Sequence, residues 1–550
     1  MTMNKVKTLA VIIYIISLVL KSNAQVSQEW VSFYNGPSNN SDIPVAMTTD
    51  NAGNIYVTGI SPEVSQGEDY LTVKYNSAGV QQWTARYHTP GSNGDNVSSI
   101  LVDNSGNVYV TGFVSYGGSN GVQITIKYNS AGAEQWIRQF GEPVSSPAAP
   151  GGIKSIATDA SGNIYIGGTR KTIPTDNGGM SLIKYNSNGD SVWTKRYKGT
   201  QFLQGLGSAV SCIKVEGDFV YVTGKTFDMN PDRTYVTTIK FDLSGVQQWI
   251  KHDSLFNGSD NVIAMDIDAS GNVIIACDFT YDILTVKYNS SGARQWRKTY
   301  VGIGSTRYDR VSGMAVDPQE NIYLTGTSYR TIGEEDFLTL KYDAAGNLLW
   351  ESFYNGNRNI GDYSKGIAVD ASGNVYVTGL TYETPFNENY MTLKYNSAGA
   401  EQWRKNYDGG NNNHHDEAVA ILLDAAGDVI VTGFADRQGS LDDYATIKYS
   451  ESVGITQTSS NIPEIYSLSQ NYPNPFNPVT HLEFAIPEFG FVSLIVYDLL
   501  GRKVAELVKS DLAPGIYTYN FDASGLSSGI YFYKLSAENF SEVKRMNLVK

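Results

Sequence analysis

The sequence predicts an all-β protein in which an eight-bladed β-propeller is followed by a small β-sandwich. Three observations lead to this prediction. A unit of about 50 residues recurs eight times before residue 450, the composition suits short strands joined by tight turns, and residues 461–550 follow a different strand pattern. Repeats of this length are typical of propellers and other repeat architectures.

The composition indicates a globular, acidic protein. The 550-residue chain contains 54 Gly, 37 Tyr and 8 Trp, and 41% of its residues are hydrophobic while 17% are charged. This balance is typical of globular and not of disordered proteins. The formal net charge is −14, so phosphate backbones and anionic lipid surfaces would repel the protein. We therefore expect no nucleic-acid partner and no membrane-surface binding.

Residues 1–24 form the expected signal peptide. A basic start with Lys5 and Lys7 precedes an apolar run over 8–20, and small residues follow as far as Ala24. These features predict secretion, with cleavage between Ala24 and Gln25. A membrane-spanning helix is the alternative, but it needs about 20 apolar residues, so no transmembrane anchor is expected.

Two phrases recur along residues 25–450, the expected propeller. The first reads Asp-x-x-Gly-Asn-x-Tyr-Val-Thr-Gly and is clearest at 50–59, 103–112, 159–168 and 370–379. The second reads Lys-Tyr-Asn-Ser-x-Gly-x-x-x-Trp, and every Trp of the chain belongs to a repeat. Its lysines mark eight units: Lys74, Lys127, Lys184, Lys240, Lys287, Lys341, Lys394 and Lys448.

Each unit is expected to form four antiparallel strands. In the second unit these are 99–103, 107–111 and 124–128, followed by a strand that carries Trp136. The strand over 107–111 is β-branched and aromatic on both faces, so it should be covered on both sides. Gly and Asn stand between the first and second strands and between the third and fourth, because they tolerate the positive φ of hairpin turns.

The first and last units predict how the ring closes. Residues 30–36 match 350–356, which form a fourth strand, whereas the last unit ends at Tyr449 without a fourth strand of its own. We expect the N-terminal strand over 28–35 to complete the eighth blade, because an open ring would expose an unpaired sheet edge.

The two phrases resemble the bacterial SBBP β-propeller repeat family over about residues 26–450. The Gly-x-x-x-Trp spacing is also similar to blades of quinoprotein dehydrogenases, which bind pyrroloquinoline quinone beside two adjacent cysteines. Cys212 and Cys277 are 65 positions apart, so that cofactor is not expected, and no other cofactor is indicated. The two cysteines could pair once, but two buried thiols are the favoured interpretation.

The C-terminal part is a separate module. Residues 451–466 read as a Ser/Thr-rich linker, and residues 467–550 as a β-sandwich of about seven short strands. Strands are expected over 492–498, 503–508, 515–521, 529–535 and 543–549, with a hairpin between the first two of them.

Three motifs of this module are similar to the type IX secretion C-terminal sorting domain: Tyr-Pro-Asn-Pro-Phe-Asn-Pro at 472–478, Val-Tyr-Asp-x-x-Gly-Arg at 496–502 and Ser-Gly-Ile-Tyr-Phe-Tyr-Lys-Leu at 528–535. The resemblance implies export across the outer membrane of a Bacteroidetes-like bacterium, with residues 467–550 engaging the type IX machinery. The mature protein would then be released or attached to the cell surface. A carbohydrate-binding sandwich is the alternative for this module.

Few residue groups suggest catalysis or metal binding. Residues 414–417 (His-His-Asp-Glu) contain adjacent histidines, but no third ligand stands at metal spacing, so an exposed loop is expected and no metal site is assigned. The acids at 334–336 and 442–443 could act as paired glycosidase carboxylates, although solvated acids in loops between second and third strands are the favoured interpretation. The repeat lysines should serve packing or ion pairs between blades, because an active site needs asymmetry.

The sequence therefore favours a secreted or cell-surface binding or scaffold protein over an enzyme, with an extracellular glycan or protein as its ligand. The alternative is a polysaccharide- or peptide-directed hydrolase or lyase with its site on one propeller face. No catalytic residues are assigned, because no region combines an acid, a base and a nucleophile.

One acidic position recurs eight residues before the Asp of the first phrase, and it is the candidate binding site. Since the first strand of a blade lines the central channel, these carboxylates are expected around one mouth of the channel. Each could cap its own turn by accepting backbone N–H bonds, or part of the ring could attract Ca²⁺. The six residues are Asp42, Asp95, Asp260, Asp309, Asp362 and Asp416.

Overall fold

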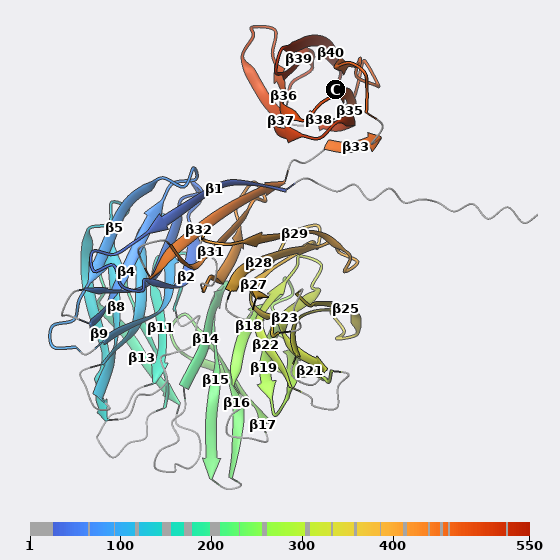
Figure 1. Ribbon diagram of the computed structural model, residues 1–550. Helices are drawn as coiled ribbons and strands as arrows, with labels where there is room; N and C mark the ends of the chain where they lie inside the picture. The colour runs from blue at the N-terminus through green and yellow to red at the C-terminus, as the bar shows by residue number, and fades with distance from the viewer. Residues whose placement is uncertain are drawn as a thin grey trace, which may run out of the picture. The chain divides into compact units, whose positions relative to one another are not determined.

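The computed structural model describes residues 26–63, 67–92, 94–115, 120–145, 156–169, 179–197, 209–229, 232–255, 261–302, 308–331, 334–356, 360–384, 387–410, 415–437, 441–451, 455–459, 462–523 and 526–550. The expected signal peptide, its cleavage site at Ala24 and Gln25, and Asp260 lie outside these residues. The described residues divide into two units, one of Gln28–Ser450 and one of Glu451–Lys550 together with Val26 and Ser27, and every regular element in them is a β-strand (Figure 1).

The larger unit contains eight four-stranded sheets, one for each repeat. Seven of them take four consecutive strands, and the eighth has the order β1-β32-β31-β30. The strands of the first four sheets are β2 (Ile43–Thr49), β3 (Ile55–Glu63), β4 (Gly67–Tyr75) and β5 (Gln81–Tyr87); β6 (Gly94–Val102), β7 (Val108–Ser115), β8 (Asn120–Tyr128) and β9 (Glu134–Ser145); β10 (Ile156–Thr158), β11 (Ile164–Thr169), β12 (Met180–Tyr185) and β13 (Ser191–Tyr197); β14 (Ala209–Glu216), β15 (Phe219–Met229), β16 (Asp232–Asp242) and β17 (Gln247–Leu255).

The remaining four sheets follow the same plan. Their strands are β18 (Val262–Ile267), β19 (Val273–Phe279), β20 (Asp282–Tyr288) and β21 (Arg294–Tyr300); β22 (Asp309–Val316), β23 (Ile322–Thr331), β24 (Glu334–Tyr342) and β25 (Leu348–Tyr354); β26 (Tyr363–Val369), β27 (Val375–Thr384), β28 (Asn387–Tyr395) and β29 (Glu401–Tyr407); β30 (Glu417–Leu423), β31 (Val429–Asp436), β32 (Asp442–Glu451) and β1 (Val26–Tyr34).

The first strands of the sheets contact one another in chain order, β2, β6, β10, β14, β18, β22, β26 and β30, and β30 also contacts β2. The N-terminal strand β1 is the outer strand of the last sheet, the position expected for residues 28–35. Its Trp30 Nε1 donates a hydrogen bond to Ser77 O in the first sheet. The N-terminal strand therefore links the last sheet to the first.

The first sequence phrase builds the turn between the first and second strands of a sheet. Asp50 Oδ1 accepts the backbone N–H groups of Ala52 and Asn54, and Asp50 Oδ2 accepts hydrogen bonds from Asn54 Nδ2 and Tyr56 Oη. Gly53 has a φ of +76°, which glycine adopts without a Cβ clash. The Tyr Oη to Asp bond recurs at Asp103, Asp159, Asp317 and Asp370.

The second phrase joins each sheet to the next. Gly132, in the turn between β8 and β9, has a φ of +81°, and a Cβ atom there would lie 2.6 Å from Trp83 Cδ2 of the preceding sheet. Trp83 Nε1 and Lys74 Nζ both donate to Ser130 O of that turn. The equivalent Lys and Trp pairs reach the carbonyls of Ser187, Leu243, Ser290, Ala344 and Ser397. Six of the eight repeat lysines thus serve contacts between neighbouring sheets, whereas Lys448 pairs with Asp424 and Asp428 of its own sheet.

The hydrophobic core lies between adjacent sheets. In β3, the consecutive residues Ile55, Tyr56 and Val57 are all 0% exposed, as expected for a strand covered on both faces. Tyr56 packs in one apolar cluster with Val108 and Ile126 of the next sheet. Elsewhere in the ring, Cys212 and Cys277 are buried thiols in a single apolar cluster.

The C-terminal unit contains two four-stranded sheets with a common apolar core. One has the order β33-β38-β35-β34 and the other β37-β36-β39-β40. The hairpin expected at the Leu-Leu-Gly-Arg turn joins β36 to β37. The strands are β33 (Ile455–Ser459), β34 (Ser467–Leu468), β35 (Val479–Ile486), β36 (Gly490–Tyr497), β37 (Lys503–Leu512), β38 (Gly515–Asp522), β39 (Gly529–Ala537) and β40 (Phe540–Leu548).

Residues 451–466 differ from the linker expected there. Strand β33 lies within this range and pairs with β38 at the edge of the C-terminal sheet. The β-branched residues Ile455, Thr456 and Thr458 favour an extended strand, which explains why a Ser/Thr-rich segment is part of the sandwich.

Candidate functional site

The two edges of each sheet carry different connections. The turns between strands one and two and between strands three and four share one edge, here named the turn edge, because neighbouring strands run antiparallel. The connections between strands two and three, and those that lead to the next sheet, share the opposite edge, here named the loop edge. The turn edge repeats the Asp, Lys and Trp contacts described above, whereas the loop edge varies in sequence. A site that needs asymmetry therefore belongs at the loop edge.

Five of the six expected acidic residues lie in the described part of the chain, and all five are buried at the loop edge. Each carboxylate accepts a backbone N–H bond from the loop six or seven residues earlier, donated by Gly36, Thr89, Gly302, Gly356 and Gly409 respectively. The residues are Asp42, Asp95, Asp309, Asp362 and Asp416, with exposed fractions of 0–3%.

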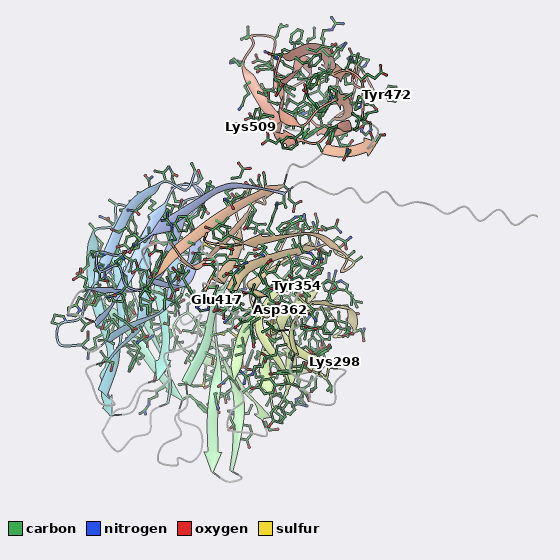
Figure 2. All side chains as sticks on the ribbon, in the orientation of Figure 1. Lys298, Tyr354, Asp362, Glu417, Tyr472 and Lys509 are labelled. Atoms are coloured by element: carbon green, nitrogen blue, oxygen red, sulfur yellow. The ribbon has the colours of Figure 1, made fainter. Side chains whose placement is uncertain are left out.

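These Asp residues also hold their loop against two sheets. Asp362 Oδ1 accepts a hydrogen bond from Thr381 Oγ1 of its own sheet, and its backbone N–H donates to Glu335 O of the preceding sheet. Asp416 accepts the Asp436 N–H in the same way, and its N–H donates to Glu388 O. All five Asp residues thus cap their loops, and the backbone N–H of Asp42, Asp309, Asp362 and Asp416 also bonds to a neighbouring sheet, while Ca²⁺ binding by the ring stays a prediction. Figure 2 labels Asp362.

Burial makes these carboxyl groups harder to ionise. It raises the pKa of Asp42, Asp95 and Asp362, and it raises the pKa of Asp416 to about 6. Hydrogen bonds from the loop N–H groups lower the pKa of each and so offset part of this effect. Backbone N–H groups and nearby hydroxyls therefore together stabilise the charge of the buried carboxylates.

His415 lies in an ion-pair network at the loop edge. Its Nε2 atom is 2.5 Å from Glu388 Oε2 and 3.5 Å from Glu417 Oε2. The Glu417 carboxylate raises the pKa of His415, and Lys365 Nζ lies 2.6 Å from Glu417 Oε1. His415 is therefore a paired, half-exposed imidazole whose protonated form the two glutamates favour, while His414 lies outside the described residues. Figure 2 labels Glu417.

The acidic pairs lie in strands and not in the loops expected from the sequence. Residues 334–336 begin β24, and residues 442–443 begin β32. Asp336 and Asp443 are buried, whereas Glu335 and Asp442 are partly exposed. Alternation along a strand explains the difference, because successive side chains point to opposite faces.

A row of tyrosines, missed by the sequence analysis, begins at the fifth and sixth sheets. The ring centroids of Tyr281 and Tyr308 are 5.6 Å apart, and those of Tyr308 and Tyr329 are 5.7 Å apart. The Arg310 guanidinium carbon lies 4.4 Å from the centroid of the Tyr308 ring. Tyr281 is 56% exposed, so this end of the row is open to solvent.

Carboxylates continue the row across the next sheets. Glu335 accepts hydrogen bonds from the hydroxyls of Tyr329 and Tyr363, and Glu388 accepts one from Tyr382. Burial and then these bonds raise the pKa of all three tyrosines, so their hydroxyls keep their protons at neutral pH. We name this surface the tyrosine–acid strip: Tyr281, Tyr308, Tyr329, Glu335, Tyr363, Tyr382, Glu388, His415, Glu417 and Asp442.

When the repeat units are aligned, some residues of the tyrosine–acid strip fall at equivalent positions. Tyr329 and Tyr382 both stand three residues after the Gly that ends the first phrase, where Pro62 stands in the first unit. One acidic position also stands six residues before the repeat Lys in four units. The acids at that position are Glu68, Glu335, Glu388 and Asp442. Finding the strip would have required comparing the variable positions of the units instead of their shared phrases.

Comparison with known proteins identifies both parts of the chain. A family model described as a secretion system C-terminal sorting domain matches residues 470–549. A second, the SBBP β-propeller repeat, matches residues 82–112, 135–169, 297–332 and 354–387. The chain carries SBBP β-propeller repeats and a type IX C-terminal sorting domain. The sorting domain indicates export to the cell surface or the extracellular space.

The described residues contain no helix that is long and apolar enough to cross a membrane.

More distant similarities extend over much of the SBBP-repeat protein. An uncharacterised WD repeat-containing protein of Acanthamoeba polyphaga mimivirus is 25% identical over 492 residues, covering 72% of this chain and 33% of that protein. The chain thus spans about a third of the length of this relative.

Among solved structures, an ulvan lyase described as a new polysaccharide lyase family is 12% identical, covers 75% of this chain and 94% of its own, and has a TM-score of 0.41. A protein of unknown function from Dyadobacter fermentans is 8% identical over 78% of this chain and 99% of its own, with a TM-score of 0.36. Drosophila plexin A, in complex with semaphorin 1b, is 8% identical over 77% of this chain and 88% of its own, with a TM-score of 0.37.

Proposed function

We propose that the SBBP-repeat protein is an exported binding protein whose tyrosine–acid strip recognises a neutral or positively charged extracellular glycan. The observation that carries this proposal is the concentration, at one stretch of the loop edge, of tyrosines and carboxylates that only some of the repeats carry. The groups common to every repeat are engaged in turns and in contacts between sheets, so they do not supply a specific surface.

The strip has the chemistry for binding sugars. Tyrosine rings offer apolar faces and a polar hydroxyl with little loss of conformational freedom, which is why tyrosine is common at recognition surfaces. Carboxylates such as Glu335 accept hydrogen bonds from sugar hydroxyls or from an amino-sugar ammonium group. The strip carries Glu335, Glu388, Glu417 and Asp442, so a sulfated or uronate-rich polymer would be repelled.

The protonation states favour binding over catalysis. The raised pKa of Tyr363 and of Tyr382 keeps both hydroxyls protonated, so they donate hydrogen bonds and do not act as bases. The nearby His415 lies between two carboxylates that raise its pKa and favour its protonated form, which opposes a role as general base.

A glycan array probed with the mature protein tests this proposal. We expect signals on neutral glucans or on chitosan oligosaccharides and none on sulfated polysaccharides. The same polymers are incubated with the protein and analysed for shortened or unsaturated products. Binding restricted to sulfated polymers, or reproducible degradation, would contradict the proposal, and degradation would support the hydrolase or lyase alternative.

A further inference from the structure

The junction between the first and second sheets brings two carboxylates and an imidazole together. Asp69 lies in β4, His88 directly follows β5, and Asp95 lies in β6. One ligand atom from each of these residues lies within 4.8 Å of the other two. Asp69 Oδ1 and His88 Nδ1 are 2.8 Å apart.

Both carboxylates are fully buried, and one of their oxygens lacks a partner. Asp69 and Asp95 are 0% exposed. Asp95 Oδ2 accepts the Thr89 N–H, but Asp95 Oδ1 makes no hydrogen bond of good geometry. The hydroxyls of Thr89 and Ser92, in the same loop, lie close enough to Asp95 to favour its charged form, although neither makes a hydrogen bond of good geometry with it. An unpaired buried carboxylate oxygen is costly, so such an atom is expected to have a ligand.

The charge at this junction also favours a cation. Asp69 and Asp95 bring two carboxylates to one buried cluster. Arg86 Nη1 lies 3.4 Å from Asp69 Oδ2 and balances that second oxygen. The two carboxylates thus face one guanidinium, which leaves negative charge for a further cation.

His88 departs from the residues that other units have at the same position. His88 stands five residues after Trp83, and the corresponding residues in other units include Asn35, Asn355 and Asp408. No other unit places a histidine at this position. His88 is therefore not required for a blade to form. Two other junctions keep both carboxylates, Asp336 with Asp362 and Asp443 with Asp42, and they have Asn355 and Asn35 in place of His88.

We propose that Asp69, His88 and Asp95 bind one divalent transition-metal ion, with Zn²⁺ as the best fit. A mixed set of one imidazole and two carboxylates suits Zn²⁺, whereas Ca²⁺ prefers oxygen ligands alone. Ligands at about 2.1 Å from a tetrahedral ion lie about 3.4 Å from one another. Metal binding therefore requires the distance between Asp69 Oδ1 and His88 Nδ1 to increase slightly. The side chain of His88 is 29% exposed, so it can move to allow this.

Isothermal titration of the untagged mature protein, first treated with chelator, tests the site with Zn²⁺, Mn²⁺ and Ca²⁺. We expect one Zn²⁺ ion per chain, weaker Ca²⁺ binding, and a higher unfolding temperature with Zn²⁺ present. The His88→Asn variant should bind Zn²⁺ at least about tenfold more weakly and lose the thermal shift. Asn is the residue of equivalent repeat positions, so this variant is expected to fold, and His88→Gln serves as a second variant.

His415→Asn is the matched control, because His415 also lies beside two carboxylates at the loop edge. It should leave the strongest Zn²⁺ site unchanged. Zn²⁺ binding that survives His88→Asn, that is lost in His415→Asn, or that is weaker than Ca²⁺ binding would overturn the proposal. These results are independent of glycan binding, so they separate the metal site from the proposed function.

Discussion

Replacing Gly132 by alanine should weaken the contact between the first and second sheets. Gly132 has a φ of +81°, and an added Cβ would lie 2.6 Å from Trp83 Cδ2 and 2.9 Å from Trp83 Cγ. Since Trp83 Nε1 also donates to Ser130 O of the same turn, the indole cannot retreat without losing this hydrogen bond. The substitution therefore combines backbone strain with a steric clash between sheets.

Gly162→Ala is a control that isolates the clash. Gly162 has a φ of +75°, but nothing lies within 4 Å of an added Cβ. Both variants should lose about 1–2 kcal/mol of unfolding free energy from the left-handed conformation. Gly132→Ala should lose about 1–3 kcal/mol more, the usual cost of overpacking a well-packed contact.

Urea unfolding of the mature protein, followed by tryptophan emission and by circular dichroism, measures the difference. The midpoint of Gly132→Ala should lie clearly below that of Gly162→Ala at equal slope. Equal midpoints would refute the inference that the Gly-x-x-x-Trp spacing exists to pack each Trp on the glycine of the next sheet.

Three further outcomes are expected. Because burial raises the pKa of Asp416 to about 6, the folded protein holds a proton that the unfolded chain has released above about pH 4. Its contribution to stability should therefore fall as the pH rises between these values, and urea midpoints of Asp416→Asn should depend less on pH there than those of the parent. Lys287→Met leaves Asp268 buried without the Nζ atom now 2.7 Å away, so it should cost about 3–5 kcal/mol in unfolding experiments. Lys214→Met, at a more exposed pair with Asp266, should cost about 1 kcal/mol or less. A chain ending at Ser450 keeps the unit Gln28–Ser450 but lacks the sorting domain, so fractionation of the native host should find it inside the cell envelope and not outside. Normal amounts of this shortened chain in the medium would contradict the role of the sorting domain.

The parts of the fold that could be predicted from sequence are those set by local chemistry. Turns depend on residues close in the chain, so Asp50, Gly53 and the Gly-x-x-x-Trp phrase were sufficient to predict strands and turns. The pairing of β1 with β32 was expected from the match between residues 30–36 and 350–356. The short strand β33 was missed, because a Ser/Thr-rich segment pairs with β38 only once the sandwich has folded.

The candidate sites depend on contacts between residues that are distant in sequence. Asp69 and His88 are separated by 19 positions, and Asp95 reaches them only because consecutive sheets meet at that junction. The repeat pattern was sufficient to locate each acidic position in the sequence. It could not show that Asp362 and Asp416 are buried under loops. The strip was missed for the same reason, because its hydrogen bonds cross between strands and sheets.

The affinity of loop-edge and turn-edge variants for one glycan tests the central claim most directly. The probe is the neutral or amino-sugar oligosaccharide with the strongest array signal, titrated against the mature protein. Tyr329→Ala should weaken binding by about tenfold or more, since buried aromatic anchors contribute more than about 1.4 kcal/mol. Gln135→Ala, an exposed change at the turn edge, should leave the affinity unchanged. Equal affinities for the parent and Tyr329→Ala, or a loss confined to Gln135→Ala, would contradict a binding site on the tyrosine–acid strip.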